Sequence, residues 1–175
     1  MIEIIKRDAT YVFNNSTLIL RGTDTKELGD ILADLLLLIP KKIKNVGYVS
    51  YGAYLQAVRV YKEIGEGILS LKTITISGHS LGAGVALIVA ILLYSRGNYE
   101  GDVYIDCCGG IKVLSKKARN YLGARAKSTI WEFRYRDPVP VLGWFKEPLH
   151  STPRSGSKKR WFLDFSIKEH VKYWG

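Results

Sequence analysis

Ser80 is the residue of this chain whose surroundings point most directly to chemistry. It stands at the centre of a Gly-x-Ser-x-Gly pattern made by Gly78-His79-Ser80-Leu81-Gly82. Residues 73–76 before the pattern are all β-branched, which predicts a buried strand. Residues 85–94 after it are apolar almost throughout and contain good helix formers, which predicts a buried helix. A serine at such a turn is held in a strained conformation that exposes its hydroxyl as a nucleophile.

The same turn offers donors for an oxyanion beside Ser80. The first N–H groups of a helix have no acceptor within the helix, so they can stabilise a negative oxygen that forms next to the serine. The bare five-residue pattern also arises by chance in glycine-rich chains. In that alternative, Ser80 only caps a helix at an ordinary strand-to-helix turn.

A nucleophilic serine needs a base to take its proton and an acid that orients the base. The chain contains three histidines. His79 adjoins Ser80 and is expected to pack into the fold around the turn. His150, in an irregular stretch, and His170, near the end of the sequence, remain as candidate bases.

Asp137 is the best-placed candidate acid. It follows an expected strand, and Pro138 and Pro140 stiffen the loop that holds it. Asp106, at the end of the preceding expected strand, is a rival. The order serine, aspartate, histidine along the chain is the one that α/β-hydrolases use.

The elements that must position these residues alternate between strand and helix. Further strands are expected at residues 17–21, 102–107 and 128–135, and further helices at residues 26–39, 48–71 and 115–122, the second interrupted at Gly65 and Gly67. This alternation predicts an α/β fold with a mostly parallel central sheet and helices on both faces, in a single domain over residues 1–175. Thr23, Ser80 and Asp137 each follow an expected strand, so they can share one edge of the sheet.

Composition sets further bounds. The chain has 175 residues and 47% hydrophobic content, which suit one folded domain. Its two cysteines, Cys107 and Cys108, are adjacent and are expected to be reduced. No segment reaches the roughly 18 apolar residues that span a bilayer, and no secretory signal is visible, so a cytoplasmic location is expected. The net charge of +10 suits an anionic membrane surface.

Four motifs in order resemble those of the class 3, or fungal-type, lipases. They are Arg21-Gly22-Thr23-Asp24, Gly78-His79-Ser80-Leu81-Gly82-Ala83-Gly84, Arg136-Asp137-Pro138-Val139-Pro140 and His170-Val171-Lys172-Tyr173-Trp174. The resemblance implies an α/β-hydrolase fold in which Ser80 is the nucleophile, Asp137 the orienting acid and His170 the base. It further implies an oxyanion hole formed by Leu81 N–H and Thr23.

The resemblance places other parts of the chain as well. It puts residues 24–34 in the lid region, whereas their helical spacing alone fits an ordinary core helix equally well. It makes His150 a loop histidine outside the triad. The family's valine-histidine-x-glycine-phenylalanine motif appears here as Val49-Ser50-Tyr51-Gly52-Ala53, and its phenylalanine-glycine-x-proline motif as Cys108-Gly109-Gly110-Ile111.

These features predict a serine-dependent hydrolase of lipid esters that needs no cofactor or metal. Two alternatives stay open. One is a catalytically silent hydrolase-fold module that binds a membrane or a partner, and the other is a nucleic-acid-binding protein, which the positive charge alone suggests.

Overall fold

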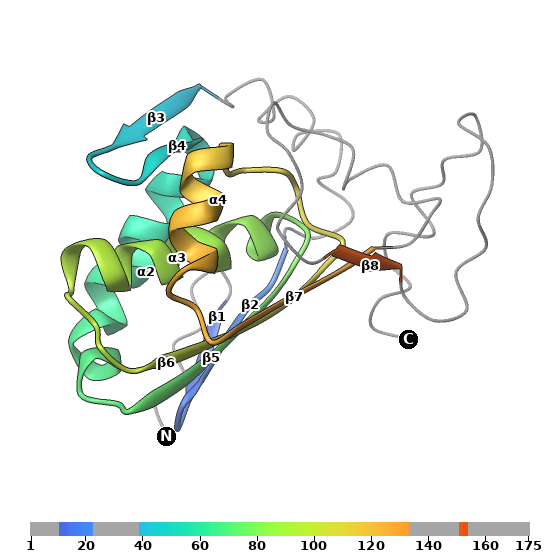
Figure 1. The fold of residues 1–175 in the computed structure, drawn as a ribbon. Helices are drawn as coiled ribbons and strands as arrows, with labels where there is room; N and C mark the ends of the chain where they lie inside the picture. Colours follow the sequence, from blue (N-terminus) through green and yellow to red (C-terminus); the bar gives the residue numbers. More distant parts are fainter. Residues whose placement is uncertain (1–10, 23–38, 134–150, 154–175) are drawn as a thin grey trace.

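The computed structural model of the protein describes residues 11–22, 39–133 and 151–153. Six strands form one sheet in the order β1-β2-β5-β6-β7-β8 (Figure 1). β1 is antiparallel to β2, and every other neighbouring pair is parallel. The strands are β1 (Tyr11–Asn14), β2 (Thr17–Leu20), β5 (Thr73–His79), β6 (Asp102–Cys108), β7 (Ser128–Phe133) and β8 (Ser151–Pro153). The predicted, mostly parallel sheet is therefore confirmed.

The central strands alternate between a buried and a more exposed face. In β6, Val103, Ile105 and Cys107 are buried, whereas Tyr104 and Asp106 are exposed. This two-residue period is the one that a strand with one covered face requires. Because β2, β5, β6 and β7 are parallel, their carboxyl ends meet at one edge of the sheet.

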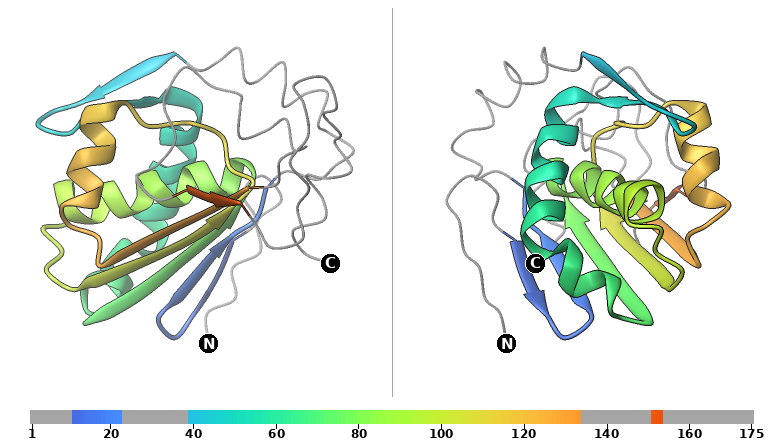
Figure 2. Two further views of the ribbon diagram at one scale, coloured as in Figure 1. Left: turned by 45° about the vertical axis from the view of Figure 1, so that its right-hand side comes forward. Right: turned by 90° about the vertical axis from the view of Figure 1, so that its left-hand side faces the viewer.

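Three described helices lie together on one side of this sheet (Figure 2). They are α2 (Tyr51–Leu69), α3 (Leu81–Arg96) and α4 (Lys116–Gly123). Every residue of α3 from Gly82 to Leu93 is buried, as predicted from its apolar sequence. A helix that is apolar all round needs cover on all sides, and α3 has it because it lies between the sheet and α2.

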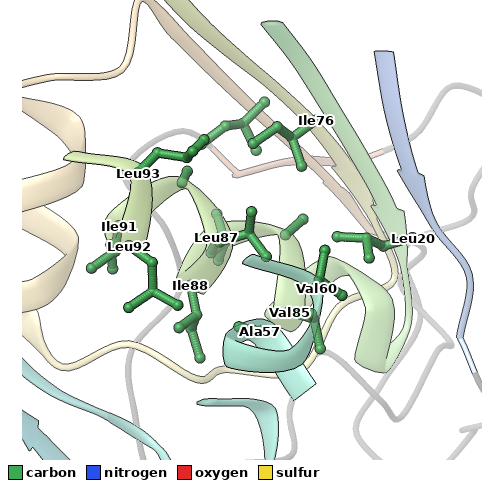
Figure 3. Close-up of a cluster of buried hydrophobic side chains, with 14 of the residues drawn as sticks. Leu20, Ala57, Val60, Ile76, Val85, Leu87, Ile88, Ile91, Leu92 and Leu93 are labelled. Carbon is green, nitrogen blue, oxygen red and sulfur yellow. The ribbon is translucent and has the colours of Figure 1, made fainter. Parts of the chain in front are cut away.

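The core forms where these layers meet. Figure 3 shows Leu20 of β2 close to Val60 of α2 and Val85 of α3, with Ile76 of β5 further along the sheet. All four side chains are at most 3% exposed. At about 25 cal/mol for each Å² of apolar surface removed from water, this burial is the main force that holds α3 on the sheet.

The region before α2 corrects one prediction. A helix was expected over residues 48–71, but residues 47–50 form a strand and the helix begins at Tyr51. Strand β3 (Pro40–Ile43) pairs with β4 (Gly47–Ser50) as an antiparallel hairpin that the sequence did not predict. The expected interruption at Gly65 and Gly67 is also wrong. The packing of α2 on α3 keeps the helix continuous, because tertiary contacts outweigh the low helix propensity of glycine.

The other predicted elements are either present or outside the described residues. The strands expected at 17–21, 102–107 and 128–135 and the helix expected at 115–122 are present within a residue or two of the predicted limits. β8 was not predicted. The helix expected at 26–39 lies outside the described residues, apart from its last residue. Within the described ranges, no helix is long and apolar enough to cross a bilayer.

Candidate active site

Ser80 occupies the turn between β5 and α3, as predicted. Its backbone has φ 56° and ψ −128°, a conformation that side-chain-bearing residues rarely adopt. Two hydrogen bonds hold the turn. Ser80 N–H donates to Cys108 O of β6 at 3.2 Å, and Ser80 O accepts from Ala83 N–H at 3.1 Å. Such strain costs about 1–3 kcal/mol and persists only where the surroundings enforce it.

Ser80 differs in conformation from Ser115, which is an ordinary helix cap in the same chain. Ser115 precedes α4 in an extended conformation, and its hydroxyl accepts a hydrogen bond from Ala118 N–H at 3.3 Å. Ser80 precedes α3 in the strained conformation, and its side chain makes no capping hydrogen bond. The interpretation of Ser80 as a mere N-cap therefore does not fit its geometry.

The two glycines of the pattern are required because neither position has room for a side chain. A Cβ at Gly78 would lie 2.5 Å from Gly82 O, and a Cβ at Gly82 would lie 2.4 Å from Leu20 O of β2. Both obstacles are backbone atoms, so no rotamer change can relieve them. The glycines allow the start of α3 to lie directly against two strands, and this contact fixes the position of Ser80.

A third glycine, Gly22, allows the loop after β2 to contact Ser80. A Cβ at Gly22 would lie 2.7 Å from Ser80 Cβ, 2.9 Å from His79 O and 3.4 Å from Ser80 Oγ. The residue that follows is Thr23, the predicted oxyanion donor, which lies outside the described residues. The sequence placed Gly22 in a motif but did not reveal that its missing side chain makes room for the serine.

The immediate neighbours of Ser80 have the positions that the sequence predicted. His79 is 9% exposed, as expected for a side chain packed around the turn. Leu81 is the first residue of α3, so its N–H belongs to the group that has no acceptor within the helix. The positive end of the helix dipole adds to the attraction of this N–H for a negative oxygen.

Cys107 is a neighbouring group that could compete as a nucleophile, and its environment excludes that role. The side chain is buried, and its Sγ lies 3.8 Å from Ala83 O. Burial, and then the nearby Cys108 and Asp106, raise the pKa of the Cys107 thiol well above its ordinary value. The reactive thiolate is therefore suppressed. Neither cysteine is part of a disulfide, as predicted.

Of the two candidate acids, the structure describes only Asp106. Asp106, the rival, is exposed and lies beside Ser77 within the paired strands, on the face that alternates with the buried Cys107. It therefore faces away from the helices and does not lie at the carboxyl edge where Ser80 stands. Asp137, His150 and His170 are outside the described residues, although β7, which leads to Asp137, ends at that carboxyl edge.

The sequence missed a contact that supports the start of α3. Gly110 follows β6, and a Cβ there would lie 2.3 Å from Trp131 Cη2 and 2.7 Å from Ala83 Cβ. Trp131 is 1% exposed. Gly110, at the x position of the phenylalanine-glycine-x-proline motif, thus lets an indole pack against the helix. Within the described ranges, no three His, Cys, Asp or Glu side chains group as a metal site does.

Solved structures share this fold. The structure of the Rhizomucor miehei triacylglyceride lipase has a TM-score of 0.63 at 21% identity, covering 78% of this chain and 56% of that chain. A triacylglycerol lipase from Penicillium expansum has a TM-score of 0.56 at 16% identity, covering 85% and 64% of the two chains. A third is a triacylglycerol lipase whose catalytic centre is formed by a serine protease triad, with a TM-score of 0.57 at 22% identity, covering 78% and 56%.

These matches, together with the strand order, define an α/β-hydrolase fold. No protein of curated function matches the chain in sequence. The family model described as Lipase (class 3) matches residues 17–144, which is most of the chain. The chain therefore belongs to the class 3 lipases. It spans little more than half the length of the Rhizomucor miehei lipase.

Proposed function

We propose that this protein is a serine-dependent carboxylic ester hydrolase that acts on lipid esters, of the triacylglycerol lipase or phospholipase type. The observation that carries the proposal is the strained conformation of Ser80 at the head of a buried helix, with Gly22 in contact with it. Family membership supports the same chemistry. Strands β1 and β8 are far apart in the sequence but belong to the same sheet, which supports one domain over residues 1–175.

In the proposed mechanism, Ser80 Oγ attacks the ester carbonyl carbon while His170 takes the hydroxyl proton. Asp137 holds the imidazole in the required tautomer and stabilises the imidazolium that forms. The tetrahedral intermediate collapses, His170 protonates the leaving alcohol, and an acyl-Ser80 ester remains. Water, deprotonated by His170, then hydrolyses this ester and releases the carboxylic acid.

The oxyanion of each tetrahedral intermediate would be bound by Leu81 N–H and by Thr23. One such donor contributes about 3 kcal/mol to transition-state stabilisation in other enzymes. The described part of the site supports this assignment in two ways. Leu81 begins α3, and Gly22 brings the loop that leads to Thr23 into contact with Ser80.

The first test uses a short p-nitrophenyl ester that dissolves in water. We expect Ser80→Ala to lower turnover by roughly 10⁴-fold, whereas Ser77→Ala, a matched change in the same strand, leaves turnover near that of the wild type. His170→Ala should be as damaging as Ser80→Ala, and His150→Ala should not. The triad assignment is wrong if His150→Ala abolishes turnover and His170→Ala does not. No turnover by the wild type would favour the silent-module alternative.

The lipid preference is the finer part of the proposal. It rests on the family and on the leucine-rich residues 28–39, which overlap the lid region expected at residues 24–34. With this lid, the reaction rate should rise sharply once the substrate concentration exceeds the critical micelle concentration. A smooth saturation curve through that point would indicate an esterase with an open cleft. Peripheral association with an anionic membrane belongs to the proposal, and a cytoplasmic location stays a prediction.

A further inference from the structure

Two stretches of the described chain contain basic residues and no acidic ones. Residues 39–62 carry Lys41, Lys42, Lys44, Arg59 and Lys62 without an aspartate or glutamate, and residues 107–131 likewise have only basic charges, among them Lys116 and Lys117. Residues 63–106, which lie between these two stretches, mix both signs, for example Lys72 with Glu100 and Asp102 where β5 and β6 begin. The positive charge is therefore concentrated in particular elements.

The fold brings parts of these two stretches together. The β3–β4 hairpin lies beside α4, on the side of the helices away from the sheet (Figures 1 and 2). Ser115 Oγ accepts a hydrogen bond from Tyr48 N–H at 3.0 Å, and Ser115 N–H donates to Tyr48 O at 2.9 Å. A Cβ at Gly47 would lie 3.1 Å from Lys117 Cβ, so the basic start of α4 is in contact with the hairpin.

Large apolar side chains are exposed among these charges. Ile39, Tyr48, Tyr51 and Leu55 are 57%, 46%, 37% and 45% exposed. We name the exposed side chains of residues 39–55, with Lys116 and Lys117, the hairpin surface. Water-facing aliphatic and tyrosine side chains that follow closely along the hairpin and the start of α2 indicate an interaction site.

Two lysines of the hairpin surface, Lys41 and Lys42, lie next to tyrosines. Lys42 and Tyr48 are directly opposite each other in the β3–β4 pair. Lys41 Nζ lies 5.9 Å from the ring centroids of both Tyr51 and Tyr54. Ammonium groups beside tyrosine rings and aliphatic side chains match the layer where a membrane's phosphate groups meet its acyl chains.

We propose that the hairpin surface docks the protein onto an anionic phospholipid bilayer. A nucleic acid would satisfy the lysines, but it would leave Ile39 and Leu55 in water, whereas a bilayer takes up both kinds of side chain. Each lysine near an anionic surface strengthens binding by about fivefold. The aliphatic side chains add binding that salt does not screen.

The hairpin is linked through Val113 to α3, the helix that follows Ser80. Ser50, the last residue of β4, donates its N–H to Val113 O at 2.9 Å. A Cβ at Gly84, in the first turn of α3, would lie 2.8 Å from Val113 Cγ1. These two contacts connect the hairpin to the first turn of the helix that follows the proposed nucleophile. The inference rests on the proposed function, because docking on a bilayer serves an enzyme whose substrate is lipid.

The test measures partition onto vesicles in the Ser80→Ala background, so that no lipid is hydrolysed. The vesicles contain phosphatidylcholine with or without phosphatidylserine. We expect binding only when phosphatidylserine is present, and a roughly 30-fold loss in Lys42→Gln/Lys44→Gln. The matched control Lys72→Gln/Lys127→Gln removes the same charge where β5 and β7 begin, so it should lose much less. Ile39→Thr should weaken binding severalfold, and Ile130→Thr, at a site on β7 that is 47% exposed, should not.

Equal losses in the two lysine pairs would show that net charge alone attracts the protein and would overturn the proposal. Binding of a DNA duplex that depends on Lys42 and Lys44, without vesicle binding, would also overturn it in favour of a nucleic acid. Turnover of a soluble ester by Lys42→Gln/Lys44→Gln with Ser80 intact should equal that of the wild type. Absence of that turnover in the wild type would refute the proposed function, whereas vesicle binding is measured independently of it.

Discussion

The substitution Gly22→Ala tests most sharply whether the loop after β2 positions Ser80. The new Cβ would lie 2.7 Å from Ser80 Cβ and 2.9 Å from His79 O, whereas ordinary carbon contacts begin at 3.4 Å. Either the loop or the serine must therefore move by several tenths of an ångström. A displacement of about 1 Å at reacting groups can cost 10²-fold in rate, so we expect kcat/KM on a soluble ester to fall by roughly 10- to 100-fold.

The fold should survive this change, because overpacking at one site typically costs only about 1–3 kcal/mol. Circular dichroism and the thermal midpoint would establish that the variant is folded. Gly67→Ala is the matched control, since a Cβ at Gly67 meets nothing within 4 Å and alanine is the better helix former. A folded Gly22→Ala variant with wild-type kcat/KM would refute the contact between this loop and the reacting serine.

Three further predictions concern stability and reactivity. Gly82→Ala should lower the free energy of unfolding by at least about 1–3 kcal/mol in a urea titration, because its Cβ would meet Leu20 O and Arg21 O at 2.4 and 2.7 Å; an unchanged midpoint would contradict the packing of α3 on β2. Burial raises the pKa of Tyr94 to about 12. Since an unfolded tyrosine ionises near pH 10, the stability that Tyr94 contributes should be full below that pH and should be lost towards pH 12, and Tyr94→Phe should flatten this part of the fall. Iodoacetamide should alkylate the partly exposed Cys108 of the native protein and spare Cys107 until urea is added; equal labelling of both thiols would show that Cys107 is accessible.

The strand, turn and helix around Ser80 were predictable because each signal is local. The β-branched residues 73–76, the paired glycines and the apolar run 85–94 specify β5, the turn and α3 without help from distant residues. The alternation of β6 and the capping Ser115 of α4 are equally local. The family resemblance came from the order of motifs and was confirmed by the family model over residues 17–144.

The elements that the sequence did not reveal depend on distant partners. β8 is three residues long and carries no apolar alternation, so only its pairing with β7 makes it a strand. Pro40 and the exposed lysines of β3 likewise give no strand signal, and Tyr48 and Val49 read as a continuation of the apolar pattern of α2. Contacts such as Gly22 on Ser80 join residues far apart in sequence, and no local pattern encodes them.

The central claim is that Ser80 is an activated nucleophile, and covalent labelling by a fluorophosphonate probe measures this most directly. The probe should add once to the wild type, peptide mass mapping should place it on Ser80, and it should be absent from Ser80→Ala and present on Ser77→Ala. Labelling should also be lost in His170→Ala, because the hydroxyl reacts only when a base takes its proton. A folded wild type that takes no label, or takes it at another residue, would contradict the account.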